Sequence, residues 1–176
     1  MLHGKLVRLR ATTPDDFEAI WRWGNDPDVV RWMFAGYPES LEQARERLAA
    51  IPPNNYRNCR FIIESLDDGR AVGFIRLRDA EPEVGHAELD VQIGEKDVWG
   101  RGYATEAMRL MCRYGFREMR LHRIGLDVVT ENAAARRIYE KVGFVEEGRL
   151  RECFRQDGEW YDMILMGLLE DELRDE

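Results

Sequence analysis

Residues 104–119 carry the most regular pattern in this sequence, and they begin just after two glycines. Apolar or small residues recur there at spacings of three and four, which is the period of one face of an α-helix. The segment before them, HAELDVQIG (86–94), alternates apolar and polar side chains, as a half-buried strand does. Between the two segments lies DVWGRG, which contains Gly100 and Gly102. The sequence therefore predicts a strand, a glycine loop and a helix in immediate succession.

This succession has two interpretations. The glycines can serve a tight turn between strand and helix. They can also let a pyrophosphate approach the unpaired amides at the helix start, where Arg101 would add a counter-charge. The segment is neither a P-loop, since it lacks the G-K-S/T ending, nor a dinucleotide fingerprint, since Thr105 stands at the third glycine position. The local pattern alone leaves both interpretations open.

The remaining segments predict an α+β fold. KLVRLR reads as a strand, and three helical pieces follow, starting at Thr13-Pro14, at Asp26-Pro27 and at the capping box of Ser40 and Gln43. Further strands are expected in CRFIIES, AVGFIRLRD and RIGLDVV, a short helix after Asn132, and a final hairpin turning near Asp157-Gly158. The order β-ααα-βββ-α-β-α-ββ predicts a mixed sheet flanked by helices. We expect one domain over residues 1–176.

The composition and charge exclude several classes of function and partner. The net charge of −8 argues against a nucleic-acid surface and favours cationic or amine partners. No apolar run reaches membrane-spanning length and the first ten residues lack the apolar block of a signal peptide, so we expect a cytoplasmic protein without membrane contact. The three cysteines and three histidines show no ligand spacing, which predicts reduced thiols and no metal. The missing G-x-S-x-G elbow argues against a serine hydrolase.

A second pair of residues adds to the glycine loop. Asn132 and Tyr139 are seven residues apart and share a helix face, although alone they could be an N-cap and a half-buried aromatic. DVWGRGYATEA followed by VVTENAAARRIYEKVGFVEEGRLRE resembles the GNAT superfamily of acetyl-CoA-dependent N-acetyltransferases. Within it, the closest resemblance is to the branch with the RimJ/RimL ribosomal-protein acetyltransferases and the bacterial spermidine N-acetyltransferases, and it covers nearly the whole chain.

The resemblance implies the GNAT acyl-CoA N-acyltransferase fold. That fold has a central mixed, mostly antiparallel sheet of about seven strands, flanked by helices. Its fourth and fifth strands, here 88–93 and RIGLDVV, are splayed apart. In this branch the C-terminal hairpin often contributes to dimers, so we expect a homodimer.

The resemblance also implies acetyl-CoA as co-substrate. The family binds the pyrophosphate on the loop and helix amides, pairs the pantetheine arm with the central strand, and contacts the cofactor through the matching asparagine. Asp97 departs from the family pattern, which often has Gln or Arg there. The implied cofactor-binding residues are Val91, Gln92, Ile93, Trp99, Gly100, Arg101, Gly102, Tyr103, Ala104, Thr105 and Asn132.

For catalysis, the match assigns Tyr139 as the general acid that protonates the departing CoA thiolate. The acceptor must attack as a free amine, although an aliphatic ammonium has a pKa of about 10. Glu88 is the candidate base, directly or through water, with Asp90 as the alternative. A strand N–H near Val91 would polarise the thioester carbonyl.

The acceptor is the least determined part. Arg76 and Arg78 share a strand face and could hold a carboxylate or phosphate, unless they are only solvated charges. The aromatic residues Trp32, Phe34 and Tyr37 could line an acceptor groove or belong to the core. We therefore prefer a peptide or protein N-terminal amine, or a small amine with an anionic group, to spermidine or spermine. A non-catalytic acyl-CoA-binding or sensing protein on the same fold is the alternative of another class, and an unrelated nucleotide-binding domain is a third.

Overall fold

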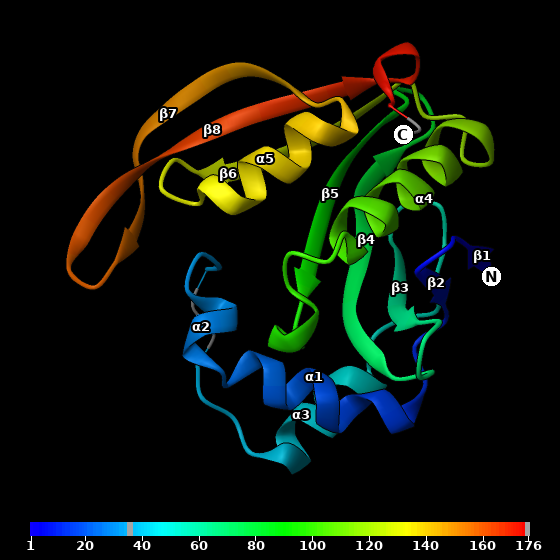
Figure 1. The fold of residues 1–176 in the computed structure, drawn as a ribbon, viewed down its shortest axis with the longest axis vertical. Helices are drawn as coiled ribbons and strands as arrows, with labels where there is room; N and C mark the ends of the chain where they lie inside the picture. The colour runs from blue at the N-terminus through cyan, green and yellow to red at the C-terminus, as the bar shows by residue number, and fades with distance from the viewer. Residues whose placement is uncertain (35–36, 175–176) are drawn as a thin grey trace.

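One eight-stranded sheet runs through the computed structural model, which describes residues 1–34 and 37–174, in the order β1-β2-β3-β4-β5-β6-β8-β7 (Figure 1). All neighbouring strands are antiparallel except β5 and β6. The expected mixed, mostly antiparallel sheet is confirmed, and the strand beyond the expected seven is the short β1. The strands are β1 (Leu2–His3), β2 (Val7–Arg10), β3 (Cys59–Ser65), β4 (Ala71–Glu81), β5 (His86–Ile93), β6 (Arg123–Val129), β7 (Val145–Gln156) and β8 (Glu159–Leu169).

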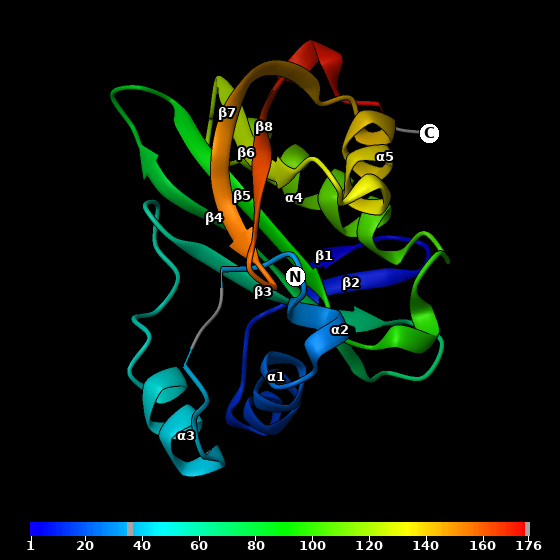
Figure 2. The same cartoon turned by 90° about the vertical axis from the view of Figure 1, so that its left-hand side faces the viewer.

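Helices cover both faces of the sheet. The long α4 packs on one face with α5, while α1 and α3 cover the opposite face beside β3 and β4, as Figure 2 shows. The predicted capping box at the start of α3 is present, with Ser40 and Gln43 exchanging hydrogen bonds of 2.8 and 3.2 Å. The helices are α1 (Phe17–Gly24), α2 (Pro27–Val30), α3 (Leu41–Ala49), α4 (Tyr103–Arg117) and α5 (Ala133–Val142), with 3-10 turns η1 (Pro14–Asp16), η2 (Lys96–Val98) and η3 (Glu170–Glu172).

The core lies between α4 and the sheet because the predicted apolar stripe of α4 meets alternate residues of the strands. Met108, Met111 and Cys112 are fully buried against β-strand residues such as Ile75 and Leu77. Cys59 is buried too, whereas Cys153 is exposed, and all three thiols are free. None of the described helices is both long and apolar enough to span a membrane.

The two central strands separate along their length. β5 and β6 pair in parallel only where His86, Ala87 and Glu88 meet Arg123, Ile124 and Gly125. Beyond Glu88 both strands continue without pairing to each other, and Figure 1 shows them diverging. The expected splay between the fourth and fifth predicted strands is therefore present. It leaves part of one edge of β5 without a neighbouring strand, and that edge positions the candidate site.

Candidate functional site

The open edge of β5 belongs to Val91 and Ile93. Gly94 N–H donates to the Val72 carbonyl at 2.8 Å, and Gly73 lies opposite Ile93. Because hydrogen-bonded and non-bonded pairs alternate along an antiparallel ladder, the backbone groups of Val91 and Ile93 point away from β4, toward the splay. Those of Gln92 point toward β4. The structure thus offers Val91 and Ile93, but not the backbone of Gln92, to an extended ligand.

The glycine loop ends in helix amides without acceptors. Gly100 and Gly102 have φ angles of 74° and 87°, in the left-handed region that favours glycine. An added Cβ would meet nothing within 4 Å at Gly100 and only the Leu6 side chain, at 3.5 Å, at Gly102. The glycines therefore serve backbone conformation rather than close packing. Within residues 1–34 and 37–174, the N–H groups of Tyr103, Ala104 and Thr105 donate to no backbone or side-chain acceptor.

The side chains around this loop divide into two groups. Tyr103 and Thr105 are buried, so these residues can offer only backbone amides to a ligand. Arg101 is exposed, with its guanidinium carbon 5.6 Å from the centroid of the Tyr103 ring. The Trp99 indole N–H donates to the Ile93 carbonyl at 3.0 Å, which occupies one acceptor of the open edge. Asp97, the departure from the family pattern, forms an ion pair with Arg70.

Tyr139 of α5 lies within electrostatic reach of Asp127 and Asp90, the carboxylates beside the splay. Its ring packs against Phe144, with centroids 6.2 Å apart. Burial raises the pKa of the Tyr139 hydroxyl, and the negative charges of Asp127 and Asp90 raise it further. The hydroxyl therefore stays protonated at neutral pH and can donate. Asn132 is the N-cap of the same helix, where its Oδ1 accepts from Ala135 N–H at 3.2 Å.

Four charged residues form a row across the sheet on the face away from α4. Arg60 of β3 lies opposite Arg76 of β4, which lies opposite Asp90 of β5. The parallel register of β5 and β6 brings Asp127 to the corresponding position beyond the splay. We call Asp127, Asp90, Arg76 and Arg60 the charged row. It is negative at the splay, near Tyr139, and positive toward β3.

The next position along β5 holds the candidate base. Glu88 lies over Gly125, where an added Cβ would come within 2.8 Å of its Oε1, and the same oxygen is 2.9 Å from His86 Nε2. Asp90, the alternative base, accepts through one oxygen from Arg76 Nε at 2.5 Å and Arg78 Nε at 3.0 Å. Since one oxygen of Asp90 already accepts from two guanidiniums, Glu88 remains the first candidate for the base. Arg76 and Arg78, the two arginines proposed to bind the acceptor, thus both lie beside Asp90.

Asp127 belongs to the charged row, and the sequence analysis did not single it out. The protein around it removes part of its hydration and raises its pKa, the carboxylates of Asp90 and Glu88 raise it further, and Arg78 partly opposes them. Its signal in the sequence was a lone carboxylate inside the apolar run RIGLDVV.

Asp127→Asn should raise the Tm at pH 7 by a small amount, because Asp127 is exposed and water screens much of the repulsion between the carboxylates. The pKa of Asp127 is above its ordinary 3.8 in the folded state, so the ionised carboxylate destabilises the fold above that folded-state pKa. The gain should disappear below about pH 4, where the carboxyl is protonated in both states. Thermal unfolding between pH 3 and 8 measures this, with the exposed turn residue Asp157, changed to Asn, as control. A lower Tm at pH 7 would contradict it.

The three aromatic candidates differ in placement. Trp32 is half-buried and packs against Tyr161 and Phe154 of the β7–β8 hairpin, with centroids 5.6 and 6.3 Å apart. Phe34 also contacts Phe154, at 5.5 Å, but stays 71% exposed. Tyr37 is 97% exposed. Trp32 and Phe34 therefore connect the α2 segment with the hairpin, and Tyr37 does not join them.

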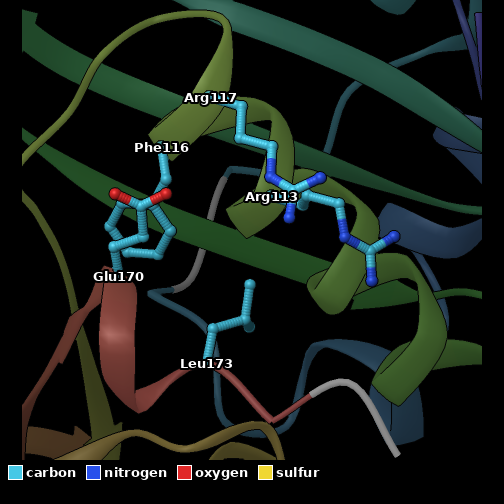
Figure 3. Close-up of a pocket in the computed structure, with 5 residues that line it drawn as sticks. All are labelled: Arg113, Phe116, Arg117, Glu170 and Leu173. Atoms are coloured by element: carbon cyan, nitrogen blue, oxygen red, sulfur yellow. The ribbon is translucent and has the colours of Figure 1, made fainter.

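A small cavity of about 60 Å³ lies elsewhere, at the C-terminal end of α4 (Figure 3). The residues that line this cavity are Arg113, Phe116, Arg117, Glu170 and Leu173. At 1.5 Å per residue, Phe116 is about 20 Å along the helix from Gly102, so this cavity is remote from the glycine loop.

Among the described residues, no group of three or more His, Cys, Asp or Glu side chains is arranged to hold a metal ion.

Comparison with known proteins agrees with this geometry. The model of the Acetyltransferase (GNAT) domain matches residues 7–145. The uncharacterized N-acetyltransferase YoaA of Bacillus subtilis is 33% identical over 156 residues, 88% of either chain. The spermidine N(1)-acetyltransferase of Vibrio cholerae is 29% identical over 164 residues, 93% of either chain. The crystal structure of spermidine N-acetyltransferase from Vibrio cholerae with CoA and spermine has a TM-score of 0.86 and 28% identity, covering 96% of this chain and 98% of that one. The protein therefore belongs to the GNAT family, and it is an N-acetyltransferase whose co-substrate is acetyl-CoA.

Proposed function

We propose that the amine acetylated by this enzyme carries an anionic group. The acceptor would be a small amine with a carboxylate or phosphate, or the N-terminal amine of a peptide or protein with an acidic residue close behind it. The charged row is the observation that carries this proposal. Its negative end, Asp90 and Asp127, suits an ammonium beside Tyr139, and its positive end, Arg76 and Arg60, suits an anion.

The proposed chemistry uses the residues around the splay. Glu88 takes one proton from the acceptor ammonium, directly or through water, which frees the nitrogen lone pair. The nitrogen then forms a bond to the acetyl carbon, whose carbonyl oxygen accepts from Val91 N–H. As the carbon–sulfur bond breaks, the Tyr139 hydroxyl gives its proton to the sulfur. The nitrogen gives its second proton to solvent, which leaves a neutral amide, and solvent also returns a proton to Tyr139 and removes one from Glu88.

Acetyl-CoA binding is assigned to the loop and the strand edge. The amides of Tyr103, Ala104 and Thr105, at the positive end of α4, would donate to the pyrophosphate, with Arg101 as counter-charge. The open edge at Val91 and Ile93 would hold the pantetheine arm.

Gly102→Ala should raise the KM for acetyl-CoA by roughly tenfold or more, because an alanine at a φ of 87° distorts the loop that presents the amides. Gly69→Ala is the matched control, since Gly69 has a φ of 74° in the exposed β3–β4 turn. Steady-state kinetics and Tm separate the effects: both variants should lose stability, but only Gly102→Ala should change this KM. If Gly102→Ala and Gly69→Ala have the same KM for acetyl-CoA, the loop at Gly102 does not bind acetyl-CoA.

Reversing one charge of the row tests the acceptor. Arg76→Glu should lower kcat/KM for an amine with a carboxylate by roughly 10- to 100-fold and raise it for a diamine of equal length. Thiol release from acetyl-CoA measures both, with the exposed Arg155→Glu as control. Parallel changes for the two acceptors would contradict the proposal.

A polyamine is the second candidate acceptor. The similarity to spermidine N-acetyltransferases over 93% of the chain favours it. Against it stand Arg60 and Arg76, which would repel a second ammonium at the positive end of the row. If kcat/KM for spermidine equals or exceeds kcat/KM for anionic amines, the acceptor is a polyamine.

We also propose a homodimer formed through the β7–β8 hairpin. β7 is the last strand of the sheet and mostly exposed, and Val145, Leu150 and Trp160 of the hairpin are 50, 44 and 56% exposed. Exposed apolar side chains along an edge strand favour pairing with another chain. Light scattering after size exclusion gives the mass, and a 20.7 kDa monomer at micromolar concentration would contradict the dimer.

A further inference from the structure

Arg60 is a partly enclosed cation with no anionic partner in the described part of the chain. Its Nε is buried and donates no hydrogen bond. Its guanidinium carbon lies 4.2 Å from the centroid of the Phe74 ring, which provides packing but no counter-ion. The charged groups that act on Arg60 are two more cations, Arg76 of β4 and Arg47 of α3.

Enclosure and the two cations lower the pKa of Arg60 from 12.5 to about 10, so the guanidinium still carries its charge at neutral pH. A protein that keeps an unpaired charge out of water loses stability, unless an anion from outside restores the missing partner. Three other arginines on this face do have anionic partners: Arg8 and Arg10 pair with Glu64, and Arg78 pairs with Asp79 and Asp90.

A second unpaired donor lies beside the same aromatic ring. Gln92 of β5 is opposite Phe74 and only 8% exposed, and its buried side-chain Nε2 donates no hydrogen bond within the described residues. Buried polar groups in native structures nearly always have partners. Arg60 and Gln92 thus flank Phe74 with donors, while Arg76, 45% exposed at the side chain, borders them with a guanidinium bound to Asp90 only through Nε.

We propose that Arg60 and Gln92, with Arg76 at the rim, form a binding subsite for an oxyanion, a carboxylate or a phosphate. Resting on the proposed function, the subsite holds the anionic end of the acceptor while its amine lies at Asp90 and Glu88. Arg60 and Asp90 are two strand spacings apart, about 10 Å between backbones. Because the Arg60 guanidinium lies over the Phe74 ring of β4, the strand next to β5, flexible amines with a terminal acid group, such as 6-aminohexanoate, have a suitable length.

The test compares Arg60→Met, which keeps length and packing, with Arg57→Met, an exposed arginine on the preceding segment. In the absence of acetyl-CoA, hexanoate or inorganic phosphate at constant ionic strength should raise the Tm of the wild type and of Arg57→Met. Neither anion should raise the Tm of Arg60→Met. Without anion, Arg60→Met should melt at or above the wild-type temperature, because a buried unpaired charge is removed. Whichever anion gives the larger shift identifies the group.

Turnover provides a second readout. With acetyl-CoA, Arg60→Met should raise the KM for 6-aminohexanoate by roughly 10- to 100-fold and leave the KM for hexylamine unchanged. Should Arg60→Met fail to fold, Arg60→Lys, which keeps the charge but loses the planar fork, should show an intermediate loss of anion binding.

The outcomes separate the two proposals. An anion-dependent Tm shift that Arg60→Met retains, or the absence of any shift in the wild type, overturns the subsite even if amines are acetylated. A different outcome is an anion-dependent rise in Tm only in the wild type and Arg57→Met, with no acetylation of anionic amines. That outcome supports the subsite and overturns the proposed acceptor.

Discussion

Tyr139→Phe is expected to lower kcat by about 100- to 10,000-fold, the usual contribution of a general acid, with the KM for acetyl-CoA nearly unchanged. The departing thiolate loses its proton donor, whereas the ring keeps its packing against Phe144. Burial and two carboxylates raise the pKa of Tyr139, so the acid stays protonated throughout the neutral range. In the wild type, kcat should therefore show no alkaline loss due to this group below about pH 10.

Tyr114→Phe is the matched control for Tyr139→Phe. Tyr114 lies on α4 with its ring 5.8 Å from that of Phe61, away from the splay, and losing its hydroxyl should leave kcat unchanged. Thermal unfolding should give the same Tm for Tyr139→Phe and the wild type within a few degrees. A Tyr139→Phe enzyme with wild-type kcat would show that solvent protonates the thiolate.

Glu106→Gln is expected to lower the free energy of unfolding by about 1–3 kcal/mol. The Glu106 carboxylate, in the first turn of α4, accepts from the backbone N–H groups of Lys5, Leu6 and Val7 at 2.8, 2.7 and 2.8 Å. A glutamine would turn an amide NH₂ toward donors and leave at least one without an acceptor. At 2–4 °C per kcal/mol for a chain of this size, the Tm should fall by roughly 2–12 °C.

Urea unfolding of Glu106→Gln and Glu118→Gln measures this effect. Glu118 follows the same helix and is exposed, so its change should alter stability by less than about 0.5 kcal/mol. Because the Leu6 side chain lies close to Gly102, within 3.5 Å of where a Cβ would stand, Glu106→Gln should raise the KM for acetyl-CoA as well. Equal stability of the two variants would mean that water replaces the carboxylate at the three amides.

Local sequence patterns predicted the order of elements well. The helical period of residues 104–119, the alternation in 86–94, the capping box at Ser40 and the turn at Asp157-Gly158 each appear in the structure. Those signals lie within one turn or one strand, where nearby residues determine backbone conformation. The splay of β5 from β6 came from family resemblance, since no local pattern reveals that two strands stop pairing after three residues.

Contacts between distant residues could not be predicted in this way. Glu106 lies in the segment DVWGRGYATEA, but the backbone amides that donate to its carboxylate are about a hundred positions earlier in the chain. Arg60 and Asp127 each place a charge among the apolar residues of a strand, a signal that could have been noticed but whose meaning depends on strand order. Only the register across β3, β4, β5 and β6 aligns them with Arg76 and Asp90.

The most direct test of the proposed activity is thiol release from acetyl-CoA by the wild-type enzyme with three acceptors of matched length, 6-aminohexanoate, hexylamine and 1,6-diaminohexane. The charged row predicts the highest kcat/KM for 6-aminohexanoate, hexylamine next and the diamine last, with each acetylated product identified by mass. A diamine that matches or exceeds 6-aminohexanoate would contradict an anionic acceptor.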